Sequence, residues 1–146
     1  MLRDHQVFKL GGREVETIFL PGHTKGSALF FDSLTGLLMA GDDISPNLWI
    51  QFEYSAPLYD YAAELIKLKK YPLKGIVSSH IGTVLPAKLI DWLEFTIAGL
   101  DERKAKVFVH PRTGRKSSMY KQLVDDKEMG NIRKIHLIYD SKNIYP

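Results

Sequence analysis

Three short segments of the chain place a histidine or an aspartate where an apolar run gives way to a turn. His23 lies in a Pro-Gly-His-Thr-Lys-Gly-Ser turn, Asp42 follows Leu-Met-Ala-Gly, and His80 follows Val-Ser-Ser. Imidazole nitrogen and carboxylate oxygen together suit a borderline divalent cation such as zinc, without any thiolate ligand. Rigid scaffolds commonly hold reactive groups on the loops at strand ends. His23, Asp42 and His80 therefore form a candidate metal site.

Each segment taken alone has an alternative explanation. A single histidine after a strand is commonly a hydrogen-bonded loop residue, and Gly-Asp is a frequent turn pair. Asp43, which follows Asp42 directly, is expected to be a solvated turn carboxylate. The metal hypothesis depends on the order in which the three segments occur and on the elements between them.

Composition narrows the class of protein. The chain has 146 residues, 45% of them hydrophobic, which is enough for the core of one domain. The formal charge of +3 is too small to indicate nucleic-acid binding by itself. The absence of cysteine excludes disulfides, thiolate ligands and cysteine nucleophiles. No signal segment begins the chain and no apolar run is long enough to cross a bilayer, so we expect a soluble, cytoplasmic protein without a membrane partner.

The elements that must position these residues alternate in type, which predicts a mixed α and β fold. Apolar and β-branched runs bounded by turn residues predict strands at residues 7–10, 15–20, 27–31, 37–40, 73–79, 106–109 and 132–139. Apolar residues at helical spacing predict helices at residues 58–70 and 86–100, the second being the longest element. A short helix is expected at residues 119–127, after a basic turn region.

The order of these segments resembles the metallo-β-lactamase superfamily. The resemblance rests on Pro-Gly-His-Thr-x-Gly-Ser, a hairpin ending in Gly-Asp, a helix, a strand ending in histidine, and a closing strand Ile-x-Leu-Ile-Tyr-Asp. It runs from about Val7 to the C-terminus. The resemblance implies a four-layer αββα sandwich, in which two sheets pack face to face between helices. Bridged metals in such proteins activate water for hydrolysis without a protein nucleophile.

The resemblance also assigns roles to individual residues. It implies that His23 binds a first metal, that Asp42 bridges two metals, and that His80 binds the second. Thr24 and Ser27 match positions that support the turn. The family usually follows its last ligand histidine directly with glycine, whereas Ile81 intervenes here.

One motif of the family is not found in the sequence. Members carry a His-x-His-x-Asp-His segment upstream, and it supplies further ligands to both metals. The five histidines of this chain are His5, His23, His80, His110 and His136, and no two of them are separated by one residue. Residues 1–146 are therefore expected to be the C-terminal half of a metallo-β-lactamase-like domain. Its expected fold class is α/β (α+β), with a mixed β-sheet covered by helices on one face and most strands in the second sheet of the sandwich.

A half sandwich has a sheet face without its natural cover. Such a face exposes apolar surface, here around Phe19 and Phe30, and marks an interface. A homodimer is the simplest partner because twofold symmetry covers both copies with one patch. An N-terminal half on another chain is the alternative.

Three functions follow from these observations. The first is a fragment or subunit of a metal-dependent hydrolase, with zinc or another divalent metal, which is inactive without its other half and acts on a small molecule when complete. The second is a non-catalytic, self-associating remnant with an empty site. The third, nucleic-acid binding, is disfavoured by the small net charge and would use Lys104, Lys106, Arg112, Arg115 and Lys116.

Overall fold

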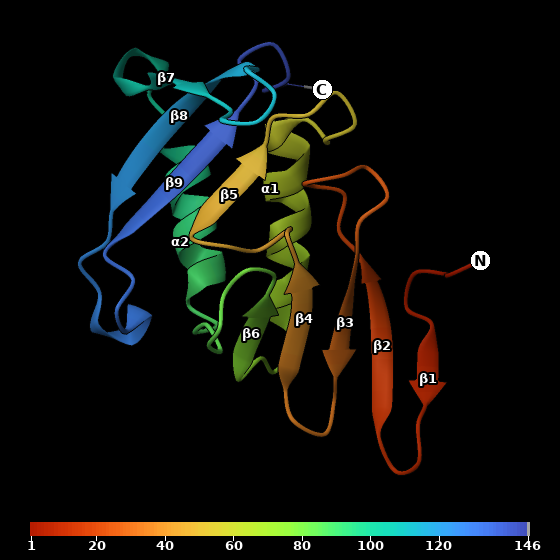
Figure 1. The fold of residues 1–146 in the computed structure, drawn as a ribbon. Helices are drawn as coiled ribbons and strands as arrows, with labels where there is room; N and C mark the ends of the chain where they lie inside the picture. The colour runs from red at the N-terminus through yellow and green to blue at the C-terminus, as the bar shows by residue number, and fades with distance from the viewer. Residues whose placement is uncertain (146) are drawn as a thin grey trace.

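In the computed structural model, which describes residues 1–145, the strands form two mixed sheets that pack against one pair of helices (Figure 1). The five-stranded sheet has the order β1-β2-β3-β4-β6 and the four-stranded sheet the order β5-β9-β8-β7. The first sheet comprises β1 (Val7–Lys9), β2 (Glu14–Phe19), β3 (Ala28–Asp32), β4 (Leu37–Gly41) and β6 (Gly75–Ser78). The second comprises β5 (Asn47–Ile50), β7 (Lys106–Val109), β8 (Lys116–Leu123) and β9 (Lys134–Tyr139). Residue 146, the last of the predicted domain, lies outside the described residues.

The first sheet follows the predicted hairpins closely. Strands β1 to β4 pair in antiparallel order, and β6 joins β4 in parallel. One face of this sheet is apolar and buried: Leu29, Leu38 and Ile76 have no exposed surface. These residues occupy neighbouring strands and face the helices, so the period-2 pattern of the strands determines which side is covered.

The second sheet differs from the sequence prediction in two places. Strand β5 was not predicted, because four residues give too short a pattern to recognise. The helix expected at residues 119–127 is wrong, since β8 occupies residues 116–123 and pairs with both β7 and β9. Tyr120 explains this outcome. Its ring is 7% exposed in the core and its hydroxyl donates to the Gly99 carbonyl, which an extended backbone allows. Tertiary contacts here override a weak local helical preference.

The two helices form the second layer and the centre of the core. Helix α1 (Leu58–Lys67) continues into the 3₁₀ turn η1 (Leu68–Lys70), as the prediction for residues 58–70 had it. Helix α2 (Leu89–Ala98) also has ten residues, so the expectation that it would be the longest element is wrong. The residues after Pro86 form a turn first. Short 3₁₀ turns at η2 (Glu102–Lys104) and η3 (Lys127–Met129) complete the elements.

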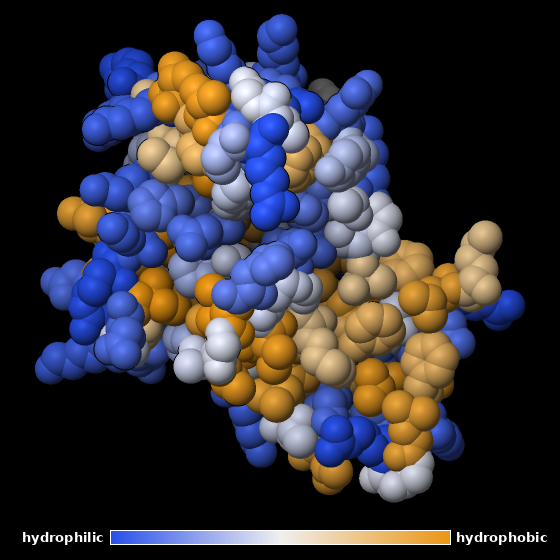
Figure 2. All heavy atoms as spheres, in the orientation of Figure 1, coloured by the Kyte–Doolittle hydropathy of each residue, from blue (hydrophilic) through white to orange (hydrophobic). Residues whose placement is uncertain are grey.

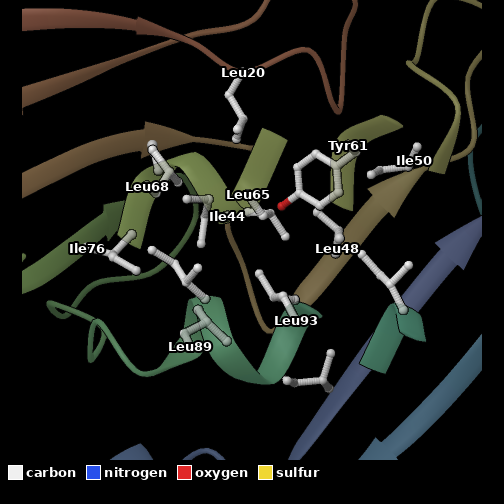
Figure 3. Packing of buried hydrophobic residues seen from close by; sticks show 14 of the residues in the cluster. Leu20, Ile44, Leu48, Ile50, Tyr61, Leu65, Leu68, Ile76, Leu89 and Leu93 are labelled. Atoms are coloured by element: carbon white, nitrogen blue, oxygen red, sulfur yellow. The ribbon is translucent and has the colours of Figure 1, made fainter. Parts of the chain in front are cut away.

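Buried side chains from every layer meet between the helices and the two sheets. Figure 3 shows Leu65 and Tyr61 of α1 beside Leu93 of α2 and Leu48 of β5, all at most 1% exposed. Each aliphatic side chain fully buried in this way contributes about 1.5–3 kcal/mol. The expected α/β class and the helix-covered half sandwich are confirmed. The strands, however, divide between two sheets. No helix within residues 1–145 has both the length and the apolar character needed to span a bilayer.

The face of the first sheet that points away from the helices is apolar and open. The strand registers place Phe30, Met39 and Val77 in one row across β3, β4 and β6. Met39 and Val77 are each 39% exposed, and Phe19 is 38% exposed on the same face. In Figure 2, hydrophobic atoms gather over this sheet at the lower right. The exposed apolar face expected around Phe19 and Phe30 is therefore present.

We predict that the chain alone self-associates through this face. Substituting Met39→Lys together with Val77→Lys places two charges in the row, and burying them unpaired in an interface is unfavourable. Sedimentation at micromolar concentration should show dimers or larger species for the wild type and monomer for this variant. The matched control, Leu34→Lys with Ile66→Lys, changes two other exposed apolar residues and should behave like the wild type. A monodisperse wild-type monomer would contradict the prediction.

Candidate metal centre

The three predicted ligands line one cavity at the junction of the two sheets. His23 lies between β2 and β3, Asp42 follows β4, and His80 follows β6. The cavity has a volume of about 350 Å³. Its lining comprises His23, Asp42, Ser45, Asn47, Trp49, Ser79, His80 and Ile81. The cavity therefore combines the ends of three strands from the first sheet with β5 of the second.

His23 is held in a defined orientation. Its Nδ1 lies 2.8 Å from the main-chain carbonyl oxygen of Trp49. A carbonyl oxygen only accepts, so Nδ1 carries the hydrogen, and in the neutral imidazole this tautomer leaves the lone pair on Nε2. The Nε2 atom lies 4.0 Å from Oδ2 of Asp42 inside the cavity. An imidazole whose outer nitrogen donates to a carbonyl is the usual arrangement of a histidine metal ligand.

The turn that carries His23 requires glycine at position 22. A Cβ atom built at Gly22 would lie 2.5 Å from the ring of Tyr61 and 2.8 Å from Oδ1 of Asp43. Both neighbours are buried, so neither can move away cheaply. Thr24 and Ser27 hydrogen-bond to each other, with 2.9 Å between their hydroxyl oxygens. This contact closes the turn, in the supporting role that the sequence resemblance implied for these two residues.

Asp42 lies between the two histidines. Its Oδ1 is 3.6 Å from Nε2 of His80, while its Oδ2 faces Nε2 of His23. Gly41, which precedes it, has a φ of +54°, and the register between β4 and β6 shifts at this point. This left-handed residue suits glycine and turns the chain so that the next carboxylate leaves the strand toward the cavity.

His80 is the most exposed of the three predicted ligands, with 88% of its side chain accessible. Its φ of +62° is the left-handed conformation, which costs a residue with a Cβ roughly 1–2 kcal/mol. Strain of this kind is concentrated at functional sites. The conformation ends β6 sharply and leaves the imidazole at the rim of the cavity beside Asp42.

Asp43 was expected to be a solvated turn carboxylate, and this is wrong. The residue is 6% exposed, and its Oδ1 accepts a hydrogen bond of 2.8 Å from the backbone N–H of His23. Its carbonyl oxygen accepts from the hydroxyl of buried Tyr61 at 2.5 Å. Burial raises the pKa of the Asp43 carboxyl to about 6, against the hydrogen bonds that lower it. Asp43 therefore positions the His23 turn from below. Nothing in the sequence around Asp43 indicated that this second carboxylate after β4 would be buried and would hold the His23 turn.

The spacing of the donor atoms agrees in part with the geometry of a zinc site. Two donors bound to one ion at about 2.0–2.2 Å each can lie at most about 4.4 Å apart. Both contacts of Asp42 meet that limit, although they use different oxygens. Within residues 1–145, no three histidine or carboxylate side chains form a compact group that could hold an ion. The donor types and spacing thus fit part of a metal site with Asp42 shared between the two histidines.

The fold that carries this cavity is part of a metallo-β-lactamase sandwich, as comparison with solved structures shows. No protein-family model and no curated protein sequence matches the chain, whereas solved structures do. One is a metallo-β-lactamase family protein from Thermus thermophilus, at 26% identity and a TM-score of 0.50, covering 64% of this chain and 32% of that one.

Two further structures have the same fold. An archaeal metallo-β-lactamase superfamily protein from Sulfolobus tokodaii has 18% identity and a TM-score of 0.53, covering 69% of this chain and 40% of its own. A metallo-β-lactamase from Pontibacter korlensis has 22% identity and a TM-score of 0.54, covering 68% and 48%. The chain thus spans between about a third and a half of these proteins, and it has part of the metallo-β-lactamase fold.

The left-handed conformation of His80 predicts an unusual order of stabilities. His80→Gly should be more stable than His80→Ala by about 1 kcal/mol, because both lose the imidazole but only glycine adopts this φ freely. At neighbouring Ile81, whose φ is not positive, the order should be reversed. Urea denaturation with EDTA present measures both pairs. Equal stabilities of the two His80 variants would contradict the strain.

Asp43 predicts how stability depends on pH in the metal-free protein. Its folded pKa of about 6 lies above the ordinary 3.8, so the folded state holds the proton more tightly. Its contribution is fully present below about pH 4 and is lost as the pH rises through about 6. Relative to Asp43→Asn, the wild type should lose about 2–3 kcal/mol of unfolding free energy between these limits. Denaturant titrations of both proteins in EDTA, at several pH values across this range, test the prediction. A difference in unfolding free energy between wild type and Asp43→Asn that does not change with pH would contradict it.

Proposed function

We propose that this chain supplies part of the metal site of a metal-dependent hydrolase, with zinc as the metal, through His23, Asp42 and His80. The observation that carries the proposal is the pair of contacts made by Asp42, whose two oxygens face Nε2 of His23 and Nε2 of His80 in one cavity. The Trp49 carbonyl supports it by fixing the tautomer of His23. The neighbouring solved structures support the class of protein.

The chemistry would be hydrolysis by a water that a bound ion activates and a substrate carbonyl or phosphoryl group that it polarises. The residues of this chain would hold the site and shape it. His23 presents a lone pair, Asp42 offers two oxygens, and Asp43 keeps the His23 turn in place. Ser45, Asn47 and Ser79 line the remaining wall with groups that can hydrogen-bond a substrate.

The proposal includes a second half that completes the site. Three donors from this chain form no compact cage within residues 1–145, and a catalytic zinc needs three protein ligands held rigidly with an open position. The missing ligands would come from a His-x-His-x-Asp-His segment packed on the open face of the first sheet. We propose that this face, with Phe30, Met39 and Val77, receives that half in the complete enzyme and a second copy of the chain when the half is missing.

A non-catalytic remnant of the fold is the second candidate. The observation that favours it is again the lack of a compact group of donors in the described part of the chain. In that case His23, Asp42 and His80 would be ordinary pocket residues, and the chain would serve only to associate with itself. Direct measurement of metal binding separates the two candidates.

We predict that zinc binds weakly to the chain alone and tightly once the second half is present. Calorimetric titration of the untagged, metal-free protein should give a weak site that His23→Ala and Asp42→Ala both abolish. His5→Ala removes a histidine that contacts Glu16 and does not line the cavity, so this control variant should bind like the wild type. Equal binding by all four proteins would remove these residues from the site.

The same experiment extends to turnover. Alone, the chain should hydrolyse lactam, thioester and phosphodiester substrates no faster than buffer with the same free metal. A separately expressed half with His-x-His-x-Asp-His should restore turnover, and His23→Ala should abolish the gain. Chelator-sensitive turnover by the chain alone, lost in Asp42→Ala, would show that the site is already complete. No zinc binding even with the second half present would favour the remnant.

A further inference from the structure

Basic residues are concentrated in one part of the sequence. Residues 103–124 contain seven of the 20 lysines and arginines and none of the 17 acidic residues, leaving 13 basic against 17 acidic residues elsewhere. The small net charge therefore hides a strongly positive segment on a chain that is otherwise net negative. This segment forms β7 and β8, two of the four strands of the second sheet.

The strand register gathers three lysines on one face of that sheet. Lys106 pairs with Met119, Lys121 pairs with His136, and Lys134 lies two residues before His136. Because side chains alternate between faces, these lysines share the face that points away from the helices. They form a diagonal across β7, β8 and β9 with steps of about 7–8 Å. The four strands contain no aspartate or glutamate.

These three lysines have no charge partner within the described residues. Every ion pair of the basic segment involves other residues, as Arg103 and Lys104 contact Asp101 and Arg115 contacts Asp140. His136, between Lys121 and Lys134, has a pKa below its ordinary value because burial and both lysines disfavour its charged form. The face thus has a positive potential that no acidic side chain among residues 1–145 neutralises by direct contact.

Aromatic side chains lie on the same face and connect it to the cavity. The ring of Trp49 meets the ring of Phe108 edge to face, with 5.4 Å between centroids, and meets His110 at the same distance. Trp49 and Asn47 also line the cavity of the candidate metal centre. Asn47 hydrogen-bonds to His136 at 2.9 Å. The basic face and the cavity therefore share residues of β5, the strand that lies beside β9 in Figure 1.

The two sheets present different chemistry on their open sides. The first sheet exposes an apolar row without charge, whereas hydrophilic atoms predominate over β8 and β9 at the upper left of Figure 2. Lysines without partners bind phosphates, and aromatic rings stack on bases. A duplex hides its bases in the stack, while a single strand offers phosphates and bases together. The chemistry of this face therefore matches a single strand.

We propose that the outer face of β5, β9, β8 and β7 binds single-stranded nucleic acid and leads it toward the cavity. Lys106, Lys121 and Lys134 bind successive phosphates, and Trp49 with Phe108 stacks on bases. The inference deepens the proposed function, on which it rests for any chemistry after binding, because it names the substrate class. The binding step itself needs no metal.

Fluorescence anisotropy with a labelled single-stranded DNA or RNA 12-mer, in EDTA, tests the binding. Replacing Lys106, Lys121 and Lys134 with glutamine should weaken binding about tenfold or more at low salt and reduce the salt slope by about 2. The matched control replaces Lys9, Lys67 and Lys74 with glutamine, three exposed lysines outside the second sheet, and has the same net charge. It should retain wild-type affinity. Circular dichroism of both triple variants establishes that each is folded.

A second readout locates the strand beside the cavity. In a Trp92→Phe background Trp49 is the only tryptophan, so its fluorescence should be quenched as the oligonucleotide binds. No binding at low salt, equal loss in both triple variants, or tighter binding of the duplex than of the single strand would each overturn the proposal. Because EDTA is present throughout, none of these outcomes affects the zinc measurements, and a failure there leaves this binding intact.

Discussion

Both sheets of this chain depend on the same two helices for burial. Leu29, Leu38 and Ile76 of the first sheet and Leu48 of the second are all fully buried against the same core as Leu65 and Leu93. Two sheets that cover one helix pair must meet along a shared seam. The strands that reach this seam end there, and the loops that follow them carry His23, Asp42 and His80. The burial of apolar side chains thus places polar donors together, although these donors contribute little to the core themselves.

Much of this arrangement could be predicted from the sequence, and the failures have physical reasons. The hairpins of the first sheet, α1 and β9 were predicted because turn residues and apolar periodicity agree there. Strand β8 was mistaken for a helix because Ser118, Met119 and Tyr120 fit either structure, and only pairing with β7 and β9 decides between them. The three pocket residues were singled out because each lies in the turn that follows an apolar run. Asp43 was misjudged because burial under the His23 turn depends on Tyr61, which lies 18 residues away.

The open faces of the two sheets differ in the kind of surface that they present. The first sheet offers an apolar row, which is suited to permanent cover by another sheet. The second offers lysines around an aromatic pair, which is suited to a charged partner that arrives and leaves. The net charge of +3 averages over these two surfaces, and so small a value taken alone argues against a polyanionic partner. The register of β8 with β7 and β9 separates them, because it assigns each lysine to a face.

Trp49 contributes to the cavity through its main-chain carbonyl and through its side chain, and a substitution changes only the side chain. Its carbonyl oxygen fixes the orientation of His23, while its side chain lies against Phe108 and His110. A main-chain carbonyl is the one acceptor that every amino acid supplies, so substitution at this position leaves the imidazole oriented as long as β5 keeps its pairing with β9. The side chain is then free to change the ligand that the surface accepts. Substitutions at position 49 over evolutionary time can therefore change which molecules this surface binds, while the orientation of His23 stays the same.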